Sequence, residues 1–195
     1  EANDATINFA NIEGETSVNN NLSIGGVVLN NLAAGTGADI TGNGSLANGA
    51  STFNYVAAAT SADLDIIGGV TAGAVDVTGT GLKSVDISST GAANTIGNLT
   101  LAASATSFTI DAATKLETGT INSSAAKTVT IKGAGAVDIN SADLEVTVNT
   151  VDGSTSTGDI DVSLGNLAAD VTNAVATFDQ VDVTVTTGSG NDEVS

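Results

Sequence analysis

The last nine residues carry the sharpest chemical motif in the chain. Residues 187–195, Thr-Gly-Ser-Gly-Asn-Asp-Glu-Val-Ser, match the calcium-binding nonapeptide G-G-x-G-x-D-x-U-x at every specified position except the first, which is threonine. In such a turn Gly188 and Gly190 permit a tight bend with inward carbonyl oxygens, Asp192 supplies a carboxylate, and Val194 anchors a short strand. Calcium takes six to eight oxygens, so a single copy is incomplete and must share ligands with a neighbouring turn. A glycine-rich strand end is the alternative interpretation.

A weaker copy of the same pattern lies near the N-terminus. Gly35, Gly37 and Asp39 have the glycine spacing and the carboxylate, but Thr41 stands where the pattern requires a large apolar residue. We predict a second candidate metal site here, with a plain turn as the simpler alternative.

Aspartates also recur at the centre of apolar-Asp-apolar triplets, at Asp65, Asp76, Asp86, Asp138, Asp161 and Asp182. If Asp65 and Asp86 lie one coil apart on the same face, their carboxylates stack about 5 Å apart and repel by about 0.8 kcal/mol in water, or about 3 kcal/mol at an effective dielectric constant of 20. Cations bound along such an acidic ladder would relieve the repulsion. A solvated outer face that discourages aggregation is the alternative.

The elements that must position these residues are short strands. Triplets of apolar, polar and apolar residues alternate as a half-buried strand requires, and glycine-containing turns separate them. Val85, Phe108 and Val129 begin three such triplets at intervals of 23 and 21 residues, and Leu64 lies 21 residues before Val85. This self-similarity predicts an all-β chain, a parallel β-helix or β-solenoid with coils of about 21 residues. A β-sandwich is the alternative.

The domain organisation follows from where the repeat is clear. We expect a β-rich segment or solenoid cap over residues 1–60, the β-solenoid over 61–186, and the start of the calcium repeat over 187–195. The 31-residue interval from Val129 to Ile160 predicts either an inserted segment or a shift in the path of the chain. Only Thr52–Ala62 and Asn166–Ala176 have weak helical patterns.

The composition excludes several classes of function. Twenty-two acids against four lysines give a net charge of −18, which argues against binding nucleic acid. No apolar run is long enough to span a membrane as a helix. With 3% aromatic residues a wide core is improbable, whereas 41% hydrophobic residues can fill a narrow one. The absence of cysteine rules out disulfides, and we expect a secreted, extracellular protein.

Catalysis is poorly supported by these residue types. There is no histidine or cysteine to act as a base or thiolate nucleophile, so we expect no enzyme. A polysaccharide-active β-helix remains an alternative, since two carboxylates suffice for glycoside hydrolysis. Paired threonines raise an ice-binding alternative, but they do not recur at one phase of the repeat. The lysines could meet anionic glycans or a neighbouring subunit, although scattered surface lysines are the simpler interpretation; they are Lys83, Lys115, Lys127 and Lys132.

Taken together, the Ala/Thr/Ser/Gly/Val/Asp-rich triplets, the lack of cysteine and the terminal nonapeptide resemble the RTX-type surface-layer (S-layer) proteins of Gram-negative bacteria. The resemblance implies a piece of a larger secreted protein that folds with calcium and self-assembles on the cell surface, on lipopolysaccharide or another surface glycan. It carries over Gly188, Gly190, Asn191 and Asp192 as a partial calcium turn. A segment of a large secreted RTX adhesin is the alternative.

Overall fold

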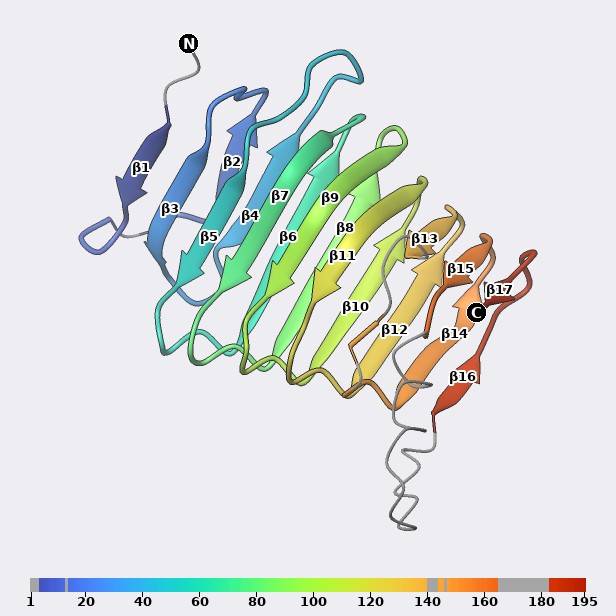
Figure 1. Ribbon diagram of the computed structural model, residues 1–195. Coiled ribbons are helices and arrows are strands. Elements are labelled where there is room, and N and C mark those ends of the chain that lie inside the picture. The colour runs from blue at the N-terminus through green and yellow to red at the C-terminus, as the bar shows by residue number, and fades with distance from the viewer. Residues whose placement is uncertain (1–3, 13, 140–143, 146, 165–182) are drawn as a thin grey trace, which may run out of the picture.

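The computed structural model describes residues 4–12, 14–139, 144–145, 147–164 and 183–195. Over these residues the chain is all-β and forms a parallel β-solenoid. Each turn contributes one strand to each of two facing parallel sheets, which Figure 1 shows as two layers running the length of the molecule. The solenoid predicted from the triplets is therefore confirmed.

Odd-numbered strands form the nine-stranded sheet and even-numbered strands the eight-stranded sheet, each in chain order. The nine-stranded sheet contains β1 (Ala5–Asn8), β3 (Val27–Leu32), β5 (Ser51–Tyr55), β7 (Thr71–Thr78), β9 (Asn94–Leu101), β11 (Leu116–Asn122), β13 (Val137–Ile139), β15 (Ile160–Val162) and β17 (Glu193–Val194). The eight-stranded sheet contains β2 (Ser17–Asn21), β4 (Gly37–Thr41), β6 (Ser61–Ile67), β8 (Ser84–Thr90), β10 (Ser107–Ala112), β12 (Thr128–Gly133), β14 (Thr150–Ser156) and β16 (Thr184–Thr186).

The core lies between the two sheets and consists of stacked columns of like residues. One column of the nine-stranded sheet runs Leu29, Phe53, Val77, Leu101, and one of the eight-stranded sheet runs Leu64, Ile87, Ile110, Ile131. All eight of these side chains are at most 3% exposed. Branched aliphatic residues fill most of this narrow space, and Phe53 and Phe108 are its largest fully buried side chains.

The coils are longer than the predicted length, with a spacing of about 23 residues. Leu64 lies opposite Ile87, not Val85, so the apparent interval of 21 residues joined positions two residues out of register. The insertion predicted between Val129 and Ile160 was also misplaced. Val129 pairs with Val151, and Ile160 belongs to the other sheet. The long coil comes one turn later, where Asp161 pairs with Glu193.

Strands β1 to β5 belong to the same two sheets as the later strands. The helix considered over Thr52–Ala62 is wrong, because this stretch holds β5 and the start of β6. Its apolar residues alternate with period 2 into the core, and this burial overrides the weak helical pattern. Asn166–Ala176 lies outside the described residues.

Gly73, Gly97 and Gly119 form one column of glycines, and close stacking of successive coils explains Gly97 and Gly119. A Cβ atom built on Gly119 would lie 1.8 Å from the carbonyl oxygen of Gly97, and one built on Gly97 would lie 2.6 Å from that of Gly73. Two outward residues follow each other at this point of β7, β9 and β11. At Gly97 and Gly119 a side chain would meet the backbone of the preceding coil, so these two positions require glycine.

Candidate functional site

The C-terminal motif forms the turn between β16 and β17. Neither Gly188 nor Gly190 has a positive φ; both are needed because the preceding coil lies so close. A Cβ atom on Gly188 would lie 2.0 Å from the carbonyl oxygen of Ser156, and one on Gly190 would lie 2.5 Å from that of Gly158. The glycines thus bring two stacked turns together, which is the arrangement that ligand sharing between turns requires.

Two carboxylates link these stacked turns through backbone hydrogen bonds. The Asn191 N–H donates to Oδ1 of Asp159 at 2.8 Å, and the Ile160 N–H donates to Oδ1 of Asp192 at 3.0 Å. Asp192 lies one residue before Glu193 and therefore opposite Ile160, whose side chain is 1% exposed in the core. The register places Asp192 at the end of an inward-facing column, with one oxygen bound to the neighbouring coil.

The same inward column contains a second polar residue. Asn94 lies opposite Leu116, which in turn lies opposite Val137. Its Oδ1 accepts from the N–H groups of Gly69 and Val70 at 3.0 and 2.8 Å. Asn94 and Asp192 therefore play the same part in this column. In each, the side-chain Oδ1 accepts a hydrogen bond from a backbone N–H of the preceding coil.

The turn at Gly35 differs from the C-terminal one. Gly35 has φ +84°, a conformation that favours glycine, whereas Gly37 would tolerate a Cβ atom 3.5 Å from that of Ser17. Asp39 lies on β4, opposite Asp65. Burial, and then the nearby Asp65 carboxylate, raise the pKa of Asp39, while a hydrogen bond from Ser17 opposes the shift.

An acidic surface does cover the eight-stranded sheet, but the predicted pair is displaced. Asp65 lies opposite Ser88, which donates a hydrogen bond to its carboxylate, and Asp86 lies opposite Asp63. The two-residue error in the repeat length explains the difference. Burial, followed by the carboxylates of Asp86 and Asp65, raises the pKa of Asp63.

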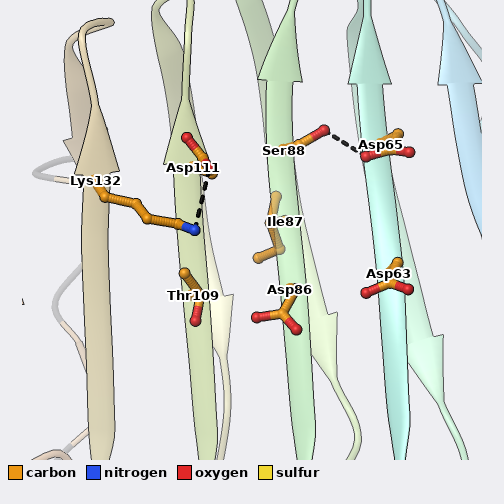
Figure 2. A pocket seen from close by; sticks show the side chains of 8 residues that line it. All are labelled: Asp63, Asp65, Asp86, Ile87, Ser88, Thr109, Asp111 and Lys132. Atoms are coloured by element: carbon orange, nitrogen blue, oxygen red, sulfur yellow. Dashed lines mark hydrogen bonds and ion pairs between the residues drawn. The ribbon is translucent and has the colours of Figure 1, made fainter.

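Asp63, Asp65 and Asp86 line a groove of about 290 Å³ on this sheet. Figure 2 shows that these side chains come from neighbouring strands. Asp111 closes the acidic part of the groove by pairing with Lys132 at 3.1 Å. The register then gives two directly opposed acidic pairs, Asp39 with Asp65 and Asp63 with Asp86.

A second acidic column, on the nine-stranded sheet, was not recognised from the sequence. Glu117, Asp138, Asp161 and Glu193 occupy one outward position of four successive coils. Lys115 lies 2.9 Å from the Glu117 carboxylate and 3.9 Å from that of Asp138, and the hydrogen bond to Glu117 raises the pKa of Lys115. Asp138 and Asp161 lie at the centre of apolar-Asp-apolar triplets, but Glu117 and Glu193 do not. The triplet pattern therefore identifies only half of the column.

These surfaces offer pairs of carboxylates to a cation rather than a complete cage. Within the described ranges, no three Asp, Glu, His or Cys side chains come together as a metal site would require. Asp182, the last of the triplet aspartates, lies outside those ranges. The strand β16, Thr184–Thr186, follows it.

The fold and its surfaces define a two-sheet parallel β-solenoid with acidic outer columns. No protein-family model, curated protein or solved structure matches the chain. Where the chain is described, it has no helix with the length and hydropathy needed to cross a membrane.

Proposed function

We propose that this chain is a non-catalytic structural segment of an extracellular bacterial surface layer, which associates with further copies of itself when calcium neutralises its acidic columns. The observation that carries the proposal is the in-register stacking of carboxylates on both sheets. Parallel strands lie about 4.8 Å apart, so opposed pairs such as Asp63 and Asp86 hold like charges at one strand spacing.

The charge balance supports a requirement for added cations. The four lysines cannot neutralise 22 acids, and two of them are already paired, Lys115 with Glu117 and Lys132 with Asp111. A net charge of −18 keeps copies apart at low ionic strength. Calcium prefers carboxylate oxygens and accepts several from different sources, so it can bridge an acidic column of one copy to that of another.

The rigid, repetitive fold supports a structural role. Each coil adds strands to the same two parallel sheets, so outward residues of successive coils stack in columns and a cation bridge can recur wherever a column is acidic. The four-residue column from Glu117 to Glu193 offers such a repeated contact. Attachment to lipopolysaccharide or another surface glycan belongs to the same proposal, with calcium joining anionic sugars to these carboxylates.

Assembly can be tested on the isolated chain. We expect light scattering and electron microscopy to show ordered arrays in 10 mM CaCl₂ and dispersed particles in EGTA. NaCl at matched ionic strength is the control, because simple screening would give the same result with either salt. Monomers under all three conditions would reject the layer, and calcium-dependent binding of a monomer to a glycan or host surface would favour the adhesin.

A further inference from the structure

Two of the four lysines lie in one column along an edge of the solenoid. Lys83 and Lys127 each end a turn that leads from an odd-numbered to an even-numbered strand, the first before β8 and the second before β12. The Lys127 N–H donates to the Thr106 carbonyl, and the Thr106 N–H donates to the Lys83 carbonyl, both at 2.8 Å. Lys83 and Lys127 are therefore exposed at the same position of the fold, two coils or about 10 Å apart.

The turns along this edge contain no acid. Those leading to β6, β8, β10 and β12 consist only of Val, Ala, Gly, Ser, Thr, Leu and Lys; they span residues 56–60, 79–83, 102–106 and 123–127. In the part of the chain that the structure describes, the ion pairs involve Lys115 and Lys132, not these two lysines. The row of turns, here called the lysine edge, is thus a cationic strip of small residues on a chain whose net charge is −18.

The opposite edge is acidic. Figure 1 shows the turns that lead into the odd-numbered strands along the other side of the molecule, away from the lysine edge. The column from Glu117 to Glu193 lies at the first or second residue of four of these strands, and Asp159 and Asp192 lie in the turns before β15 and β17. We call this row the acidic edge. Its one lysine, Lys115, is paired with Glu117.

The two edges match in spacing as well as in charge. Asp138 lies opposite Asp161, which lies opposite Glu193, so Asp138 and Glu193 are two coils apart, as Lys83 and Lys127 are. A second copy placed alongside with its axis parallel has the same coil spacing. If it is offset by three coils, about 14 Å, both lysines of one copy reach these two acids of the other.

We propose that the lysine edge of one copy docks against the acidic edge of a second copy, with the two solenoids side by side and in the same orientation. The contact joins two different surfaces, so each copy keeps one free edge of each kind and the row continues instead of closing. This inference rests on the proposed self-association and names the surfaces that carry it.

A second copy fits the lysine edge better than an anionic glycan does. The acidic edge offers carboxylates at the repeat of the solenoid itself, whereas a flexible glycan anion would be repelled by the acids on both sheets. Complementary charges of this kind set the partner and the register of a contact more than its affinity. Because two ion pairs at a surface are weak alone, calcium still has to reduce the repulsion between the remaining acids.

Charge reversal tests the contact on the whole chain. In 10 mM CaCl₂ and low salt, sedimentation velocity should show that Lys83→Glu with Lys127→Glu weakens self-association about tenfold or more, because the reversed edge then meets acids. Asp138→Lys with Glu193→Lys should weaken it to a similar extent. A 1:1 mixture of the two double variants should recover association, since every contact in an alternating row then joins opposite charges.

Lys132→Glu is the matched control. It changes the net charge as much as reversal of one edge lysine, but Lys132 lies on the outer face of the eight-stranded sheet, where it pairs with Asp111. This variant should associate like the natural chain. Circular dichroism melts of each variant check that the solenoid still forms.

No recovery in the mixture would overturn the contact, and so would equal weakening by Lys132→Glu. If the double lysine variant still self-associates but no longer binds dextran sulfate, the lysine edge takes an anionic glycan and the inference is overturned. The outcome is separable from that of the proposed function. Calcium-driven arrays that survive both double reversals would reject this contact only, whereas recovery as short rows without arrays would support the contact and reject the surface layer.

Discussion

Neutralising one acid of an opposed pair should stabilise the solenoid. Asp63 lies directly opposite Asp86 on the neighbouring parallel strand, and its carboxyl pKa is raised by burial and by the carboxylates of Asp86 and Asp65. In Asp63→Asn the side chain keeps its size but loses its charge. We expect the variant to be more stable than the natural chain at pH 7 and in low salt.

The size of the effect follows from the spacing of the strands. Two unit charges about 5 Å apart repel by about 0.8 kcal/mol in water and by about 3 kcal/mol at an effective dielectric constant of 20. Because Asp63 is an exposed residue, solvent screening favours the lower figure, about 0.5–1 kcal/mol. For a chain of this size such a gain raises the melting temperature by about 1–4 °C.

The gain in stability of Asp63→Asn should depend on pH. A carboxyl whose pKa is raised in the folded state destabilises the fold when ionised, so this cost is present at neutral pH and disappears as the pH falls through the folded pKa. The advantage of Asp63→Asn should therefore vanish below about pH 4, since the natural side chain is then protonated. It should also shrink in 0.5 M NaCl or in millimolar calcium.

Urea denaturation followed by circular dichroism measures the free energy of unfolding at each pH. Asp152→Asn is the matched control, because the hydrogen bonds that Asp152 accepts from Ser154 lower its carboxyl pKa. That substitution should give no gain at pH 7. A gain of equal size from both variants, or a gain from Asp63→Asn that persists at pH 3, would refute the argument from opposed charges.

Three further substitutions test the stacking of the coils, each by the change in the free energy of unfolding. Gly119→Ala places a Cβ atom 1.8 Å from the Gly97 carbonyl and should cost about 2–4 kcal/mol, whereas Gly73→Ala, with nothing within 4 Å, should cost less than about 1 kcal/mol; equal costs would contradict the close-approach explanation. Leu64→Ala removes a side chain that is 0% exposed and should cost about 2–5 kcal/mol, and a loss below 1 kcal/mol would mean that this column does not form the core. Asn94→Leu matches the leucine beside it in the column but leaves the N–H groups of two residues without an acceptor, at a cost of about 1–3 kcal/mol; a neutral result would show that these groups find another partner.

The residue pattern by itself determined the class of fold. Alternation within triplets such as Val85-Asp86-Ile87 gives strands with one apolar face. Their recurrence, predicted near every 21 residues, favoured parallel stacking over a β-sandwich, and the structure confirms the solenoid with a spacing of about 23 residues. The poverty in aromatic residues indicated a narrow core, and the stacked columns of leucine, isoleucine and valine confirm it.

Only the tertiary structure decided which acids face each other. A shift of two residues preserves the alternation of a strand, so the triplets at Leu64 and Val85 could not reveal that Leu64 lies opposite Ile87. That shift moves the partner of Asp86 from Asp65 to Asp63. The acids of the other sheet, from Glu117 to Glu193, become a column only when coils of unequal length are brought into register.

The sequence also could not predict which polar side chains are buried where the coils turn. Glu15 follows Gly14 in a polar stretch that indicates a solvated turn, yet both oxygens of its carboxylate are buried, as is the hydroxyl of Thr36. The C-terminal motif shows the same division. Its spacing predicted a turn with an acid, while the requirement for Gly188 and Gly190 comes from the backbone of the coil beneath them, since local conformation does not demand glycine there. Short-range alternation therefore specifies strands, but contacts between residues some 23 positions apart specify the surface that those strands present.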